Sequence, residues 1–198
     1  MNTQPSAPAT SPLDAHAFLF NPNVRILGAI SDGTFWDFMS QVAKVRETAD
    51  DPVVLELNTQ GGDADVARRI AEEVRLCRNW HGRKTFVVGK SFVYSAGITI
   101  MSAFPRQNRF LTADTFLLIH ERRLDTTIEL KGPVRSNIQI LREQLAAMET
   151  ANTIERQGFE DFAKGSKLSV DDLYERATTN FYLTAEEAVG HQLAEAII

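Results

Sequence analysis

Apolar and polar positions along the first 120 residues follow two alternating patterns. Short, mainly apolar runs predict strands, and they lie at about 23–30, 52–58, 84–88, 110–111 and 116–119. Segments with apolar residues at helical spacing predict helices between these strands, at about 34–47, 64–78 and 98–104. Because strands that alternate with helices form βαβ crossovers, the pattern predicts an α/β fold with a largely parallel sheet.

The residues between these segments predict how the elements begin and end. Thr34, with an acidic residue three positions later, has the form of a capping box and predicts the start of the first helix. Gly61 and Gly62 follow the second strand, where they predict a tight turn into the second helix. A loop is expected between Gly89 and Ser95, before the third helix.

The pattern changes after residue 120. A polar connection at 124–133 is followed by one long helix, predicted at about 134–158. The apolar positions of this helix are spaced by four, three, four and three residues, and they are Val134, Ile138, Leu141, Leu145 and Met148. A narrow apolar seam of this period is typical of a helix that packs against a partner helix. We therefore expect this helix to lie outside the main core. The alternative is a long surface helix that packs on its own domain.

The C-terminal part of the chain predicts a helix, a strand and a last helix. Ser169 caps the first of these helices, which reaches about residue 178. Residues 181–183 form the strand, and Thr184 with Glu187 makes a clean capping box at the start of the last helix.

Composition narrows the classes of function. The chain has 198 residues, is 43% hydrophobic and carries a formal net charge of −5 without a basic stripe, which disfavours a nucleic-acid surface. Residues 1–15 are rich in Ala, Pro, Ser and Thr and predict a disordered leader, followed by one domain at 16–198. No run reaches the roughly 20 apolar residues of a membrane helix. The N-terminus lacks a signal-peptide pattern, so we expect a cytoplasmic protein.

Cysteine and histidine usage predicts no metal centre. Cys77 is the single cysteine, which excludes an intrachain disulfide and a cysteine-rich metal site. It is in register with Val66, Ile70 and Val74, so we expect it in the core. The four histidines form no HExxH or similar pair.

Ser95 and His120 are the candidate catalytic residues. Ser95 lies between a predicted strand and a predicted helix, where helix-terminal amides can hold an oxyanion. His120 closes the strand at 116–119. Each has a simpler explanation alone, Ser95 as a helix N-cap and His120 as a satisfied strand-end histidine. Gly61 and Gly62 let backbone amides face a ligand at a third strand end. Together these features are the parts of a serine hydrolase site.

Five stretches, in order along the chain, resemble the Clp protease proteolytic subunit family. They are RILG at 25–28, LELNTQGG at 55–62, YSAG at 94–97, LLIH at 117–120 and FYLTAEEAVG at 181–190. The corresponding family segments read RIIFLG, a strand with NSPGG, ASMG, MIH and DRFLSAEEAxxYG. The resemblance implies the α/β spiral of the ClpP/crotonase fold, with a C-terminal strand and helix. It also implies a protruding handle at about 124–165, used for ring-to-ring contact.

The resemblance implies a mechanism as well. Ser95 would be the nucleophile and His120 its general base, and the amides of Gly62 and Ala96 would form the oxyanion hole. Asn180 falls at the position of the family's triad aspartate. An Asn can orient an imidazole but supplies no charge to stabilise the imidazolium. The implied activity is that of a serine-type endopeptidase. It would cut peptides or unfolded proteins inside a self-assembled homo-oligomeric ring, without a metal or organic cofactor.

Two further departures from the family pattern concern partners and the site. His120 is followed by Glu121 and Arg122, where the family usually has Gln and Pro. Glu56 lies where the family often has an aromatic residue lining the pocket for its AAA+ unfoldase. Because a charge in an apolar socket weakens docking, the AAA+ partner is open for this chain, as absent or different.

Two other functions follow from the same residues. With Asn180 in the triad and bulky residues before Ser95, the chain is alternatively a non-catalytic subunit that assembles with an active relative. Asp171, Asp172 and Glu187 are acids that could replace the missing charge. A crotonase-type acyl-CoA enzyme would use the same fold and paired backbone amides, but it gives Ser95 and His120 no obvious role.

Overall fold

The computed structural model describes residues 14–48 and 51–198, and these form an α/β fold around one mixed sheet. The leader predicted at 1–15 lies almost entirely outside the described residues. The sheet has the order β1-β2-β3-β4-β7, with β5 beside β3 and β6 beside β5. Its strands are β1 (Val24–Ile30), β2 (Val53–Gly62), β3 (Thr85–Tyr94), β4 (Arg109–Leu111), β5 (Phe116–Ile119), β6 (Phe181–Thr184) and β7 (Ala196–Ile197). All pairs are parallel except β5 with β6.

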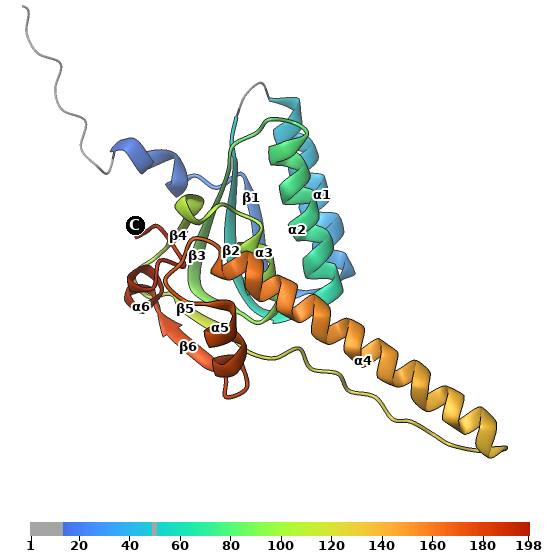
Figure 1. Cartoon of the computed structure of the whole chain (residues 1–198). Helices are drawn as coiled ribbons and strands as arrows, with labels where there is room; N and C mark the ends of the chain where they lie inside the picture. Colours follow the sequence, from blue (N-terminus) through green and yellow to red (C-terminus); the bar gives the residue numbers. More distant parts are fainter. Residues whose placement is uncertain (1–13, 49–50) are drawn as a thin grey trace, which may run out of the picture.

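Helices cover the sheet on one face and extend from its lower edge (Figure 1). The α-helices are α1 (Asp32–Glu47), α2 (Ala64–Asn79), α3 (Ala96–Ser102), α4 (Val134–Ala163), α5 (Val170–Ala177) and α6 (Ala185–Gly190). Two short 3-10 helices are η1 (Asp14–Phe20) and η2 (Arg106–Asn108). The predicted alternation of strands and helices is therefore confirmed, while η1, η2 and β7 were not predicted.

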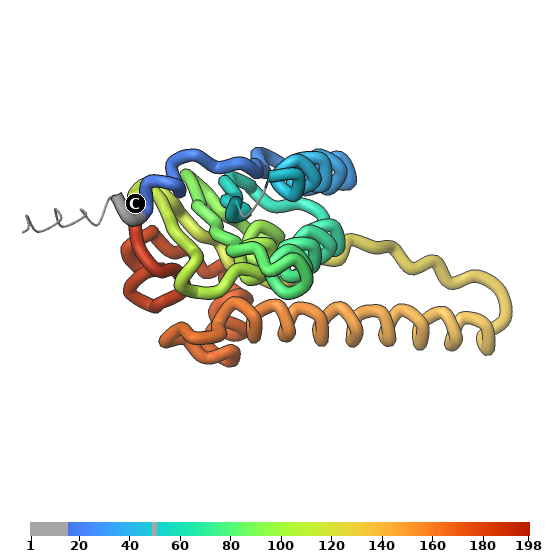
Figure 2. The backbone as a smooth tube through the Cα atoms, turned by 90° about the horizontal axis from the view of Figure 1, so that it is seen from above, coloured from blue at the N-terminus to red at the C-terminus, as the bar shows by residue number. Residues whose placement is uncertain are grey.

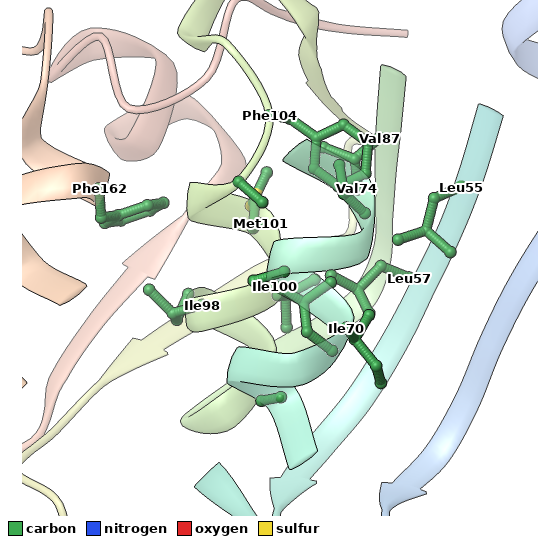
Figure 3. Packing of buried hydrophobic residues seen from close by; sticks show 14 of the residues in the cluster. Leu55, Leu57, Ile70, Val74, Val87, Ile98, Ile100, Met101, Phe104 and Phe162 are labelled. Atoms are coloured by element: carbon green, nitrogen blue, oxygen red, sulfur yellow. The ribbon is translucent and has the colours of Figure 1, made fainter. Parts of the chain in front are cut away.

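The main core lies between the sheet and the helices α1 to α3. Leu55 and Leu57 of β2 meet Ile70 of α2 and Ile100 of α3 there (Figure 3). Cys77 is buried in the same cluster, as its register predicts. A smaller cluster on the opposite face of the sheet is formed by Leu19, Val54, Val88 and Phe110. Both faces of the central strands are thus covered, which explains why these strands read as nearly continuous apolar runs.

The first helix begins two residues earlier than its pattern predicts. Ser31 is the N-cap of α1, and it forms a capping box with Thr34 at the third helical position. Thr34 is therefore a partner of the cap, and the prediction that it starts the helix is wrong. Its hydroxyl donates to the carbonyl of Ala29 at 2.7 Å, which joins the helix start to the end of β1.

The two glycines and the expected loop before Ser95 also differ from prediction. Gly61 and Gly62 are the last residues of β2, with φ of 96° and 149°, and Asp63 is the N-cap of α2. Strand β3 continues to Tyr94, so the predicted loop is a strand with an irregularity. Its register to β2 shifts between the pairs Leu57–Gly89 and Thr59–Val93. A bulge of this kind absorbs extra residues without ending the strand.

The long helix starts at Val134 as predicted but runs on to Ala163. Only its C-terminal end is buried, through Phe159, Phe162 and Ala163. The remainder projects from the body beside the segment 121–133 (Figure 2). Its apolar seam is open to solvent, with exposed fractions of 75% for Val134, 44% for Ile138, 45% for Leu141, 56% for Leu145 and 41% for Met148. The seam is therefore not covered by the described part of its own domain.

A buried arginine joins the end of α4 to the sheet. Arg109 of β4 is 2% exposed, and its guanidinium donates to five backbone carbonyls. The acceptors lie at the end of α3, at the end of α4 and after α6, and they are Ser102, Phe104, Asp161, Phe162 and Leu193. Burial lowers the pKa of Arg109 to about 10, so the side chain is charged at neutral pH.

We expect Arg109→Ala to destabilise the fold strongly, because each buried acceptor left without a donor costs about 1–3 kcal/mol. The unfolding free energy from denaturant titration should fall by about 3 kcal/mol or more. Arg106→Ala is the matched control, since its ion pair with Glu195 at 2.7 Å is partly exposed and worth at most about 1 kcal/mol. Equal losses for the two variants would contradict this account of Arg109.

Candidate active site

Three strand ends bring the predicted site residues together. An added Cβ at Gly61 would lie 2.7 Å from the Ser95 Cβ, so the end of β2 touches the residue that follows β3. The Ser95 N–H donates to the Leu118 carbonyl at 2.8 Å, and Tyr94 pairs with Leu118 in the sheet. His120 follows β5 directly, beside this contact. The carboxyl ends of neighbouring parallel strands are where α/β folds assemble their sites.

Ser95 has an unusual backbone conformation. Its φ is 56° and its ψ is −118°, between the last residue of β3 and the first residue of α3. A positive φ is costly for a residue other than glycine, and such residues gather at functional sites. Ser95 is the N-cap residue of α3 by position, as the simpler explanation has it, but its side chain makes no capping hydrogen bond. Ala96 is the first residue of α3, where amides have no partner within the helix.

His120 is half-buried, and one hydrogen bond assigns its tautomer. Its Nδ1 lies 2.5 Å from the backbone carbonyl oxygen of Glu121. A carbonyl oxygen only accepts, so the proton of the neutral ring is on Nδ1 and the lone pair is on Nε2. This is the tautomer that a general base needs in order to take a proton from a serine.

Asn180 and His120 flank the last pair of strands β5 and β6 but are not bonded to each other. The antiparallel register ends with Ile119 paired to Phe181; His120 follows Ile119, and Asn180 precedes Phe181. Among the hydrogen bonds of the described residues, none joins these two side chains. Asn180 is exposed and has a φ of 60°, and its N–H closes the turn after α5 by donating to Ala177. Asn tolerates this left-handed conformation better than most residues, which gives it a structural role.

A cleft of about 1110 Å³ contains four of the five predicted site residues. Gly62, Ser95, Ala96 and His120 lie on its wall, and Asn180 does not. The helices α2 and α4 supply much of the rest of the wall. The cleft is large enough to take an extended segment of a peptide or a small acyl compound.

The cleft also holds Arg122, which departs from the family pattern, and two acids that the sequence did not single out, Asp65 and Glu155. Arg122 makes an ion pair with Asp65 of α2 at 2.8 Å, and this bond holds the pKa of Asp65 below its usual value. Glu155 of α4 accepts the backbone N–H of Arg122, and burial raises the pKa of its carboxyl group. The sequence places Glu155 in the long helix predicted at about 134–158 but gives no sign of which residues it faces. No sequence signal therefore links Glu155 to His120.

The described residues offer neither a metal-binding cluster nor a membrane-spanning helix. Within 14–48 and 51–198, His, Cys, Asp and Glu side chains form no group of three or more that could hold a metal ion. None of the helices in these ranges is long and apolar enough to cross a lipid bilayer.

One cleft thus brings together a serine at a strand-to-helix junction, an imidazole whose Nδ1 binds a carbonyl, and a glycine-rich strand end. These are the kinds of group that a serine hydrolase site requires. A sequence model of the Clp protease family matches residues 13–198. The chain therefore belongs to the Clp protease family, and the predicted family and its serine-type endopeptidase class are confirmed.

The similar proteins include ATP-dependent Clp protease proteolytic subunits. Subunit 2 of Pseudomonas aeruginosa is 26% identical over 175 residues, which cover 88% of this chain and 80% of the relative. Subunit 3 of Rhizobium meliloti is 25% identical over 177 residues, which cover 89% of this chain and 83% of the relative. The fold is similar to that of a ClpP1 mutant from Listeria monocytogenes, with a TM-score of 0.73, 21% identity and coverage of 93% and 95%. The predicted ClpP-like fold is thus confirmed.

We expect Gly61→Ala to displace Ser95 in addition to straining the backbone. Gly28 provides the matched control, because its φ of 86° is similar to the 96° of Gly61 but an added Cβ would meet nothing within 4 Å. Gly28→Ala should cost about 1–2 kcal/mol of stability and leave Ser95 reactive. Gly61→Ala should cost more and abolish labelling of Ser95 by a serine-reactive fluorophosphonate. Retained labelling in Gly61→Ala would show that the two strand ends are not in close contact.

Proposed function

We propose that this chain hydrolyses peptide bonds with Ser95 as nucleophile and His120 as general base. The observation that carries the proposal is the shared cleft, in which Ser95 follows β3 in a strained conformation and His120 follows β5 with Nε2 free to accept a proton. The backbone amides of Gly62 and Ala96 are the proposed oxyanion hole, supported by their place on the same wall.

The proposed reaction proceeds through an acyl-enzyme. Ser95 Oγ attacks the peptide carbonyl while His120 Nε2 takes its proton, and the oxyanion forms near the amides of Gly62 and Ala96. The imidazolium then gives its proton to the leaving amine as the C–N bond breaks. A water molecule, activated by the same Nε2, hydrolyses the ester and restores Ser95.

Asn180 stays a candidate for the third position of the site. Its place next to the Ile119–Phe181 pair, on the side where His120 follows β5, supports that role. Its carboxamide would reach the ring only if the His120 Nδ1 proton left the Glu121 carbonyl. An Asn at this place would orient the ring without adding charge.

We further propose that the exposed seam of α4 buries itself against other copies of this chain, so that the sites face an enclosed chamber. The five exposed apolar residues between Val134 and Met148 support this, because an uncovered stripe of heptad-like period favours helix pairing. Peptides or unfolded proteins are the proposed substrates, and a cytoplasmic location is part of the same proposal.

A separate proposal concerns how an ATPase partner would dock on this chain. The relatives above are named as ATP-dependent proteolytic subunits. In this chain, Glu56 lies at the proposed docking face and pairs with Arg25 and Lys90, each at 3.1 Å. We propose that this charged group replaces an apolar socket, so that any AAA+ unfoldase of this chain docks differently or is absent.

Labelling with a serine-reactive fluorophosphonate tests the proposed nucleophile. We expect one adduct on the intact wild-type protein, none on Ser95→Ala, and labelling slowed by about 100-fold or more in His120→Ala, because the base activates the serine. Intact-protein mass measures the adduct. An assembled, folded wild type that takes no label would instead identify the chain as a non-catalytic subunit. Turnover of an acyl-CoA without labelling would revive the crotonase alternative.

The double variant Leu141→Glu with Leu145→Glu tests assembly through the seam. It should separate the oligomer into smaller species in sedimentation velocity, because two charges would have to be buried at the contact. Glu143→Lys also changes a charge on α4 but points away from the seam at helical spacing, so it should leave assembly unchanged. A wild type that sediments as a monomer would refute the assembly proposal.

A further inference from the structure

Glu155 enters the cleft of Ser95 and His120 from α4. Its Oε2 accepts the backbone N–H of Arg122, two positions after His120. Burial raises the pKa of Glu155, and so does the nearby charge of Glu121, while the Arg122 hydrogen bond and the charge of His120 act in the opposite direction. A half-buried carboxylate therefore lies within electrostatic reach of the candidate general base.

One peptide group connects this carboxylate to the imidazole. The carbonyl oxygen of Glu121 accepts the Nδ1 proton of His120 at 2.5 Å, and the N–H of the same peptide group belongs to Arg122 and donates to Glu155. The peptide is trans, so its C=O and N–H point in opposite directions and can serve the two partners at once.

The chain of hydrogen bonds gives the carboxylate an effect on the ring. Hydrogen bonds in series polarise one another, and a bond to an ionised acceptor is stronger than one between neutral groups. The charge on Glu155 draws the Arg122 N–H towards it and makes the Glu121 carbonyl a better acceptor. That carbonyl then holds the Nδ1–H tautomer of His120 and stabilises the imidazolium formed during attack by Ser95.

We propose that Glu155 is a positioning residue for His120, acting through the peptide group between Glu121 and Arg122. The inference rests on the proposed roles of Ser95 and His120. In this arrangement Glu155 supplies the negative charge that Asn180 lacks.

The peptide group is held in place from a second side. The Arg122 guanidinium pairs with Asp65 at 2.8 Å, so α2 fixes the side chain of the residue whose N–H is bound by α4. The orientation of the Glu121 carbonyl is therefore set by two helices, which is what a relay to His120 requires.

The first test compares Glu155→Gln with the wild type. The amide oxygen of Gln can still accept the Arg122 N–H, so a merely structural role would leave the site working. Under the proposal, the second-order rate constant for fluorophosphonate labelling of Ser95 falls by about 10- to 100-fold, the range seen when the hydrogen-bond partner of a metal-binding histidine is removed. Glu160→Gln makes the same change on an exposed part of α4 and should label at the wild-type rate.

Asn180→Ala removes the other candidate for orienting His120. Its labelling rate should fall by less than that of Glu155→Gln if Glu155 supplies the charge. A large loss in Asn180→Ala, together with a wild-type rate in Glu155→Gln, would overturn the inference and assign the orienting role to Asn180.

A second pair of variants tests the peptide group itself. Arg122→Ala and Arg122→Pro both lose the ion pair with Asp65, but only proline removes the N–H. Arg122→Pro should label at least about 10-fold more slowly than Arg122→Ala. Equal rates in the two would overturn the relay even if Glu155 variants fail to fold.

The outcomes separate the inference from the proposed function. If the wild type does not label at all, the roles of Ser95 and His120 fail, and the inference fails with them. If the wild type labels, Ser95→Ala does not, and Glu155→Gln labels at the wild-type rate, the peptidase site stands and only the role of Glu155 is refuted. Sedimentation and thermal melting of each variant show that the compared proteins are folded and assembled.

Discussion

The buried guanidinium of Arg109 fixes the elements that form the cleft. A charge taken out of water is costly unless all its donors are satisfied, and Arg109 meets this requirement with carbonyls at the ends of α3 and α4. Free carbonyls at helix C-termini favour a cation, so the same contact satisfies both sides. Ser95 lies at the other end of α3, and Glu155 lies on α4 shortly before its anchored end. One constraint thus sets the position of both walls of the site.

The general plan of the fold could be predicted because its signals are local. Buried strands read as apolar runs, and the capping boxes at Ser169 and Thr184 use side chains three residues apart. The irregularity in β3 and the place of Gly61 and Gly62 within β2 could not be predicted in this way. They depend on the pairing of β3 with β2 and on the close approach of Gly61 to Ser95, which link residues far apart in the sequence.

The residues of the candidate site also fall into those that local signals predict and one that depends on tertiary packing. Ser95, Ala96, Gly62 and His120 follow predicted strands, and parallel strands bring their ends to one edge, so the sequence identifies residues that share a cleft. Glu155 is 35 positions from His120, on a helix whose apolar seam ends at Met148. Nothing in that pattern indicates that position 155 faces the cleft. Its relation to His120 depends on how α4 leaves the body, and that geometry is set by contacts such as those of Arg109.

Two departures from the family pattern are connected by this geometry. A proline at position 122, as the family pattern has it, would offer no N–H to Glu155, and the peptide group could not join the carboxylate to the imidazole. This chain has Arg122 at that position and Asn180 where the pattern has an aspartate. Asn180, which precedes β6, thus carries no charge, and in the same chain the backbone N–H of Arg122 is available to bind the carboxylate of Glu155 on α4. Since Glu155 lies between the exposed seam and the buried end of the same helix, the helix proposed to assemble the particle also carries the charge proposed for its base.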